Sequence, residues 1–304
     1  MISGKKLNKY SKLITNFKLL MPRCVMKILF ALFLIISLSS CATEKRRNID
    51  IEIDNSTSVS PQTFERYVDI IINDIIKNMK EKDCLSIKFI DECSLTQSDR
   101  IFNLDLSQKD FSEGTDGFNN AADSIKMRIE KFINDSISVS LRNIIYKSKS
   151  QRADCSQYTN IIEAFNQSIG LKKELANYDS ELDIALNNAA GEDTYNYENV
   201  IIIFSDMINE DRGNKYNFTG FNRINEKDIN DKLSQLEAEK KTPDLRDYKI
   251  IVCGATASNK LALNADTQIK NIKLFWEKLF KLSGSNLIAY GYDTELEIIN
   301  FMKK

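Results

Sequence analysis

Three oxygen-bearing side chains follow an alternating apolar and acidic stretch near residue 50. The sequence "NIDIEID" at residues 48–54 runs into "NSTSVS", so that Asp54, Ser56 and Ser58 stand at every second position. One carboxylate and two hydroxyls are hard oxygen donors, which suit Mg²⁺ because it takes octahedral oxygen coordination and keeps several waters. The same residue types also cap the first turn of many helices. The spacing alone leaves both interpretations open.

The composition excludes several kinds of chemistry. The 304-residue chain has no histidine, which removes Ser-His-Asp and Cys-His nucleophiles, histidine general bases and imidazole zinc sites. Any metal would be held by oxygen or by thiolate. With 42 basic and 43 acidic residues the formal net charge is −1, so no overall field attracts nucleic acid and we expect no nucleic-acid partner.

The elements that would position these residues alternate between strands and helices. Apolar runs predict six strands, at residues 49–54, 85–91, 101–106, 199–204, 248–253 and 286–291. Apolar residues spaced by three and four predict helices, at residues 61–81, 226–241 and 266–284. The runs "VIIIF" and "KIIVCG" are apolar throughout, as expected for central parallel strands covered on both faces. We therefore predict an α/β fold: a doubly wound, mostly parallel six-stranded sheet with helices on both faces and extra helices between strands three and four.

Ligands of such a sheet bind at the carboxyl ends of its strands, and there the chain resembles a von Willebrand factor type A (VWA) domain. That family's metal-ion-dependent adhesion site combines D-x-S-x-S after strand one with a Thr from a middle loop and an Asp after strand four. Asp206 closes "NVIIIFSD" and matches the Asp. Thr159 precedes a short amphipathic segment upstream of strand four and is the favoured Thr, with Thr194 as its competitor. The resemblance implies a site for Mg²⁺, Mn²⁺ or Ca²⁺ made by Asp54, Ser56, Ser58, Thr159 and Asp206.

The resemblance also implies a function and shows departures. In the family, the open position of the metal takes an Asp or Glu of a protein partner, and no catalytic base is apparent here, so we expect a binding protein and not an enzyme. The family's fourth strand usually ends in Asp-Gly, whereas Met207 follows Asp206 in this chain. Nearby Glu210 and Asp211 could supplement the site, cap a helix or simply lie in solvent.

Two alternatives remain open. The first is a VWA-like scaffold without metal that serves as a structural or assembly lipoprotein. The second is a metal-dependent hydrolase, because "IDIEIDNST" is faintly similar to the D-x-D-x-T loop of haloacid-dehalogenase phosphatases. In this chain, however, Glu52 lies two residues before Asp54 and Ser56 lies two residues after it, which departs from the phosphatase motif.

The start of the chain predicts export. Residues 28–40, "ILFALFLIISLSS", follow Arg23 and Lys27 and have the length of a secretory h-region, which is short for a membrane span. The run ends in "LSSC", which resembles the lipobox of bacterial lipoproteins and makes Cys41 the expected lipidated residue. A plain signal peptide or a buried apolar helix are the alternatives.

This pattern divides the chain into three parts. We expect a signal peptide at 1–40 with Met26 as the natural start, a lipidated linker at 41–47 and a VWA-like domain at 48–304. The expected location is the bacterial cell envelope, extracytoplasmic and anchored to the membrane by lipid on Cys41. Ala42 favours the outer membrane in a Gram-negative host.

Four cysteines lie in the exported part. Cys84 and Cys93 flank a predicted strand, and nine steps at about 3.3 Å would hold them about 30 Å apart, beyond disulfide reach. Cys93 ends strand two and Cys155 precedes the Thr159 loop, so we expect these two to meet at the metal-bearing edge as a disulfide. Cys253, inside "YKIIVCG", is predicted to be a buried small hydrophobe.

Overall fold

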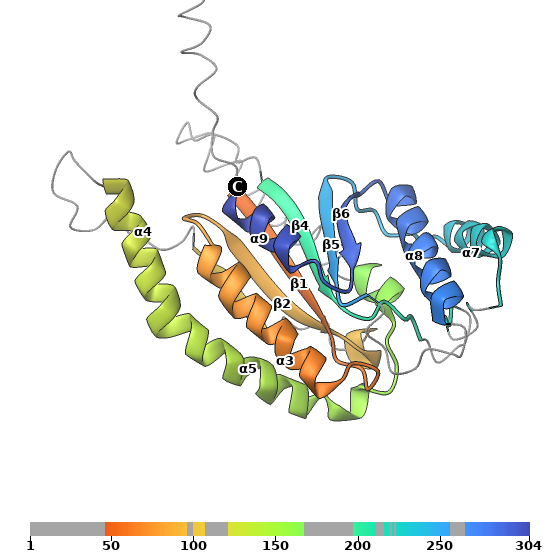
Figure 1. Ribbon diagram of the computed structural model, residues 1–304, viewed down its shortest axis with the longest axis horizontal. Helices are drawn as coiled ribbons and strands as arrows, with labels where there is room; N and C mark the ends of the chain where they lie inside the picture. The colour runs from red at the N-terminus through yellow and green to blue at the C-terminus, as the bar shows by residue number, and fades with distance from the viewer. Residues whose placement is uncertain are drawn as a thin grey trace, which may run out of the picture. The chain divides into compact units, whose positions relative to one another are not determined.

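A six-stranded sheet forms the centre of the computed structural model (Figure 1). The structure describes residues 46–95, 100–106, 121–166, 197–210, 216–218, 221, 223–255 and 265–304. Residues 45–304 form one compact unit, and the predicted signal peptide and Cys41 lie outside the described residues. The strands are β1 (Arg46–Asp54), β2 (Cys84–Ile90), β3 (Phe102–Asp105), β4 (Tyr197–Phe204), β5 (Tyr248–Cys253) and β6 (Asn286–Gly291).

The strand order confirms the predicted α/β fold. The order is β3-β2-β1-β4-β5-β6, and every neighbouring pair is parallel except β2 with β3. The chain winds outward from β1 to β3 and then crosses to the other side of β1 for β4, β5 and β6, which is the doubly wound pattern. Its direction therefore reverses between β1 and β4, whose carboxyl ends lie side by side.

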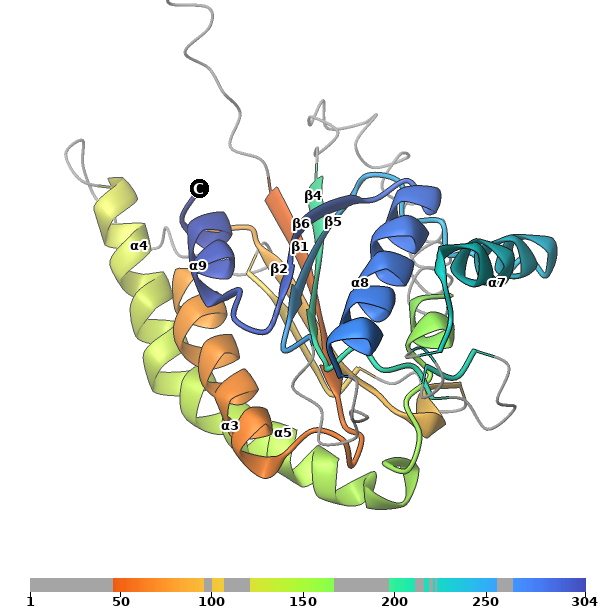
Figure 2. The ribbon, with the colours of Figure 1, turned by 45° about the vertical axis from the view of Figure 1, so that its right-hand side comes forward.

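Helices cover both faces of the sheet (Figure 2). One face carries α3 (Pro61–Ile70), α5 (Ser138–Gln151) and α9 (Glu295–Lys303), and the other carries α7 (Glu226–Ala238) and α8 (Ala265–Leu282). Within β4, Val200, Ile202 and Phe204 belong to the first core while Ile201 and Ile203 belong to the second. This two-sided burial explains why the central strands are apolar throughout.

Between β3 and β4 the structure has the predicted extra helices. α4 (Ala121–Phe132) continues through a π-helical turn (Ile133–Ile137) into α5, and residues 161–166 are again helical. α3 also passes into a π-helical turn (Ile71–Ile75) and then a 3₁₀ turn (Ile76–Asn78), so the helix predicted at 61–81 ends earlier and is less regular. Among the described residues, no helix is both long and apolar enough to cross a membrane.

β1 presents two different faces, which explains its alternating sequence. Ile49, Ile51 and Ile53 are fully buried against the α3 side. On the other face Asp50 accepts a hydrogen bond from the Ser86 hydroxyl, and the fully buried Glu52 pairs with Lys88 Nζ at 2.8 Å. Asp50 and Glu52 are therefore paired across to β2.

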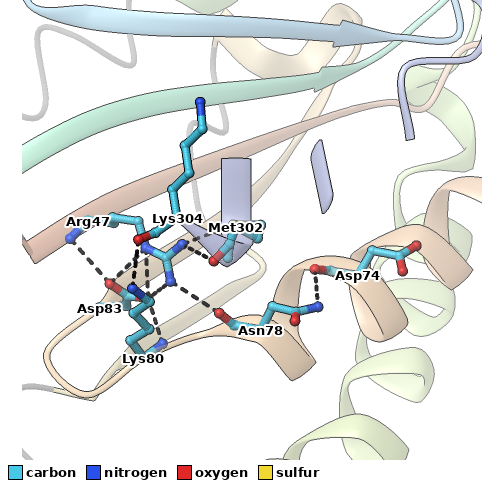
Figure 3. A network of polar contacts seen from close by, with 7 residues as sticks. All are labelled: Arg47, Asp74, Asn78, Lys80, Asp83, Met302 and Lys304. Carbon is cyan, nitrogen blue, oxygen red and sulfur yellow. Dashed lines mark hydrogen bonds and ion pairs between the residues drawn. The ribbon is translucent and has the colours of Figure 1, made fainter. Parts of the chain in front are cut away.

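A buried ion pair closes the amino edge of the sheet (Figure 3). Arg47, at the start of β1, donates from Nε to both carboxylate oxygens of Asp83 at 3.1 Å, and from Nη1 to the Met302 carbonyl at 2.6 Å. It also reaches the Asn78 carbonyl at 3.1 Å. Lys80 Nζ donates to the Lys304 carbonyl at 3.1 Å. These contacts fasten the end of the α3 segment and the C-terminal helix α9 to β1.

Candidate functional site

The loop after β1 folds back on its own carboxylate. Asp54 Oδ1 accepts the Ser56 N–H at 2.8 Å, and the hydroxyls of Ser56 and Ser58 lie 2.7 Å apart. The N-cap of α3 is a different residue, Ser60, whose Oγ accepts the Thr63 N–H at 3.1 Å ahead of Pro61. The capping interpretation of Ser56 and Ser58 is therefore wrong, and their hydroxyls contact each other.

A second loop brings Thr159 to the same carboxylate. Thr159 and Glu210 exchange two backbone hydrogen bonds, Thr159 N to Glu210 O at 3.1 Å and the reverse at 2.7 Å. The Thr159 hydroxyl lies 3.5 Å from Asp54 Oδ1. The chain thus places the favoured Thr beside Asp54, and its competitor Thr194 lies outside the described residues. Glu210 acts here through its backbone, and Asp211 lies outside the described residues as well.

The end of β4 supplies the third segment. Ser205 Oγ donates to Asp54 Oδ2 at 2.7 Å and accepts the Met207 N–H at 2.9 Å. Asp206, the next residue, accepts the Ile208 N–H through Oδ1 at 2.9 Å. Asp206 thus directly follows a residue that contacts Asp54, and its own Oδ1 holds the turn that begins after it. The sequence interpretation missed Ser205, although its position directly before Asp206 at the end of an apolar strand was a usable signal.

The turn after Asp206 keeps a glycine-like backbone in spite of its methionine. Met207 has φ of 62°, in the left-handed region that favours glycine. Its side chain is fully buried, and its carbonyl accepts the indole N–H of Trp276 at 2.9 Å. The next turn is held by the fully buried Asn209, whose Oδ1 accepts the N–H groups of Ile161 and Ile162 at 2.8 and 3.3 Å. Packing and side-chain hydrogen bonds thus hold a left-handed turn at a methionine.

A disulfide ties the Thr159 loop to the end of β2. Cys93 and Cys155 are bonded with their Cα atoms 5.3 Å apart, which confirms the predicted pair. Close to it, Thr57 N donates to the Ser156 carbonyl at 2.9 Å and joins the Ser56–Ser58 loop to the same segment. Cys253 is a fully buried free thiol, as predicted.

Charged groups surround the loop after β1. Arg152 pairs with the buried Asp91, from Nε to Oδ2 at 2.8 Å and from Nη2 to Oδ1 at 2.6 Å. Asn55 bridges this pair to Lys149, since its amide donates to Asp91 at 3.3 Å and its Oδ1 accepts Lys149 Nζ at 2.9 Å. Burial lowers the pKa of Lys149, and the charges of Asp54 and Asp91 oppose that shift.

Burial also shifts the pKa of Asp54. Desolvation raises the pKa of this carboxyl, and hydrogen bonds from Ser205 and Ser56 partly oppose the rise. All five candidate side chains are almost completely buried, at 0% to 2% exposure. Thr57, between the two serines, is exposed and marks where the loop reaches the surface.

The donor set fits an oxygen-seeking cation. The Ser56 and Ser58 hydroxyls lie within hydrogen-bond range of each other, and the Thr159 hydroxyl lies within range of the Asp54 carboxylate. Asp206 adds a second carboxylate directly after Ser205, which contacts Asp54. Such hard donors suit Mg²⁺, Mn²⁺ or Ca²⁺. Among the described residues no three or more His, Cys, Asp or Glu side chains cluster as metal ligands, so hydroxyls would have to complete any coordination sphere here.

The geometry weakens the hydrolase alternative. A phosphatase loop would use a second acidic side chain at position 52 beside that of Asp54. Glu52 is instead fully buried and paired with Lys88 on the neighbouring strand. Glu52 and Asp54 therefore contact different groups. Glu52 is part of the β1–β2 pairing, and Asp54 alone reaches the carboxyl edge.

Comparisons with known proteins identify no family for this chain. No protein-family model matches the chain, and no curated protein matches it. Among solved structures, proximal thread matrix protein 1 from the mussel byssus aligns with 11% identity and a TM-score of 0.32. The alignment covers 86% of this chain and 47% of that one, so the chain spans about half the length of the mussel protein. A likeness of this size supports no conclusion about function.

Proposed function

We propose that this chain binds a protein partner through a divalent cation held by Asp54, Ser56, Ser58, Thr159 and Asp206. One observation carries the proposal: two chain segments bring a carboxylate and three hydroxyls together, with a 2.7 Å contact between the two serines and a 3.5 Å contact from Thr159 to Asp54. The resemblance to VWA domains, noted on the same five residues, points to the same chemistry.

The position in the fold supports the proposal. Ligands of doubly wound sheets bind outside the carboxyl ends of the strands where the strand order reverses. Here the reversal lies between β1 and β4, and Asp54 and Asp206 come at or just after the ends of these two strands. The left-handed Met207 supports it further, because the backbone takes the conformation that Asp-Gly would give.

Each residue would have a defined role. Ser56, Ser58 and Thr159 would offer hydroxyl oxygens, while Asp54 and Asp206 would supply negative charge. A bound Mg²⁺, Mn²⁺ or Ca²⁺ would supply an electrophilic position for a carboxylate of the partner. Two nearby carboxylates raise one another's pKa unless a cation compensates them, and burial already raises the pKa of Asp54.

The burial of the site sets a condition on partner binding. Because the five side chains are 0% to 2% exposed, a partner's carboxylate can reach a bound cation only if the surface around Thr57 opens. We therefore expect partner binding to be coupled to a local rearrangement of the loop after β1.

The proposal includes anchoring to the bacterial cell envelope through lipid on Cys41. The "LSSC" sequence after a short apolar run supports it. Replacing Cys41 with Ser should release the protein into the soluble fraction and remove any lipid label. Membrane retention without lipid label would contradict the anchor and leave the cation site untouched.

The function is tested with an Asp54→Ala variant beside a matched Asp50→Ala control on the same face of β1. Titration calorimetry should show binding of Mg²⁺ or Mn²⁺ to the parent and to Asp50→Ala, and none to Asp54→Ala. A partner retained from native membranes in Mg²⁺ should elute with EDTA and fail to bind Asp54→Ala. A parent protein that binds none of the three cations, or an Asp54→Ala variant that binds them equally, would refute the proposal.

A further inference from the structure

A tyrosine on α3 ends at the carboxyl edge of the sheet. Tyr67 is fully buried, and its ring packs on that of Phe204 with centroids 5.2 Å apart. Its hydroxyl lies against Gly254, the residue that follows β5: a Cβ at that position would be 1.9 Å from Tyr67 Oη. Gly254 also has φ of 94°. The backbone after β5 thus makes room for a phenol hydroxyl that any other residue there would displace.

The Tyr67 hydroxyl has no hydrogen-bond partner among the described residues. A buried hydroxyl without a partner destabilises the folded state, and phenylalanine would fill the same space without that cost. Unpaired buried groups of this kind usually mark a bound water, an ion or a functional role. The hydroxyl therefore needs an explanation beyond packing.

Two carboxylates of the candidate site act electrostatically on the Tyr67 hydroxyl. Burial raises the pKa of the Tyr67 phenol, and the nearby Asp54, Cys253 and Asp206 raise it further while Arg66 acts in the opposite direction. The phenol therefore stays protonated and can donate. The Cys253 thiol, whose pKa burial also raises, is directed to the Tyr292 carbonyl at 3.8 Å and is a weak acceptor. Among the groups that act on the phenol, the carboxylates of Asp54 and Asp206 are the stronger hydrogen-bond acceptors.

We propose that Tyr67 is a positioning residue of the cation site, whose hydroxyl donates to a water in the coordination shell of the cation. The inference rests on the proposed function, because the cation is the one held by Asp54, Ser56, Ser58, Thr159 and Asp206. A buried water needs two to four polar partners, which the phenol, a site carboxylate and the cation would provide. Mg²⁺ and Mn²⁺ sites commonly keep such waters. Groups that orient ligands from outside the coordination sphere typically change metal affinity 10- to 100-fold.

The test uses the full chain, Mn²⁺ as the probe, and Tyr67→Phe. Titration calorimetry should give a Kd for Mn²⁺ about tenfold higher than that of the parent. Water-proton relaxation by bound Mn²⁺ should also change, because it reports the coordinated waters. In EDTA, Tyr67→Phe should unfold at the same or a higher urea concentration than the parent, since the variant removes an unpaired hydroxyl.

Thr242→Val is the matched control. Thr242 Oγ1 is another buried hydroxyl without a partner among the described residues, and it lies between α7 and β5, at the opposite edge of the sheet. This variant should leave the Mn²⁺ affinity and the relaxation unchanged.

The outcomes separate the two proposals. A parent that binds no Mn²⁺ refutes the proposed function and the role of Tyr67 together. A parent that binds Mn²⁺, with a Tyr67→Phe variant of equal affinity and equal relaxation, refutes the role of Tyr67 alone. The role is also refuted if Tyr67→Phe is less stable in EDTA, or if Thr242→Val loses Mn²⁺ affinity to the same extent.

Discussion

The left-handed turn at Met207 predicts an unusual order of stability between two substitutions. Met207 is fully buried with φ of 62°. Both Met207→Ala and Met207→Gly lose the buried side chain, at a cost of about 2 to 5 kcal/mol. Glycine is ordinarily about 0.5 to 1 kcal/mol less favourable than alanine, but a left-handed conformation costs an L-residue about 1 to 2 kcal/mol. Met207→Gly should therefore be more stable than Met207→Ala by about 1 kcal/mol, the net of these two terms.

Urea unfolding in EDTA, followed by circular dichroism, measures this difference. Ile208 is the control, because it is 2% exposed in the same core and is not among the described residues with positive φ. There the ordinary order should hold, with Ile208→Gly less stable than Ile208→Ala. If Met207→Gly were also less stable than Met207→Ala by the usual margin, the turn after Asp206 would not be left-handed, and its equivalence to Asp-Gly would fail.

Three further predictions concern the charges and the disulfide. Burial raises the pKa of Asp54 above its ordinary 3.8, so its contribution to stability without metal is full below pH 3.8 and is lost as the pH rises through the folded-state pKa. Asp54→Asn in EDTA should gain stability relative to the parent over that window, and an equal pH dependence of urea unfolding in both would contradict this. Arg47→Met leaves the buried Asp83 without its partner and should lower the free energy of unfolding by about 3 to 5 kcal/mol; adding Asp83→Leu should restore much of it, and an unaffected single variant would count against the network. Because Cys93 and Cys155 are 62 residues apart, replacing both with Ser should cost about 2 to 4 kcal/mol, matched by the parent in reductant; no change in either would show that the bond does not stabilise the fold.

The fold could be predicted from local patterns because its central strands are buried on both faces. Continuous apolar runs predicted β4 and β5, alternation predicted β1, and shorter apolar runs predicted the other three strands, all to within a few residues. The π-helical turns at Ile71–Ile75 and Ile133–Ile137 could not be predicted. Their apolar residues have the same spacing as those of an ordinary α-helix, so the sequence does not distinguish the two. The C-terminal helix α9 was not predicted, and its docking depends on Arg47, which is 255 residues from Met302.

The candidate site could be predicted only in part. Asp54, Ser56 and Ser58 are neighbours in sequence, and a resemblance was needed to add Thr159 and Asp206. Contacts between loops that are far apart in the sequence could not be predicted. Ser205 meets Asp54 across 151 residues, and Tyr67 approaches the site from the middle of a helix whose sequence is ordinary. Spacing reports neighbours along one element, whereas these contacts depend on how the elements pack.

The central claim is that five side chains hold one divalent cation, and anomalous diffraction from crystals grown with Mn²⁺ tests it most directly. We expect one strong peak within coordination distance, about 2.0 to 2.2 Å, of the hydroxyls of Ser56 and Ser58, with Asp54, Thr159 and Asp206 around it. Asp206 turned away from an empty serine pair, in crystals that hold Mn²⁺ elsewhere on the chain, would contradict it.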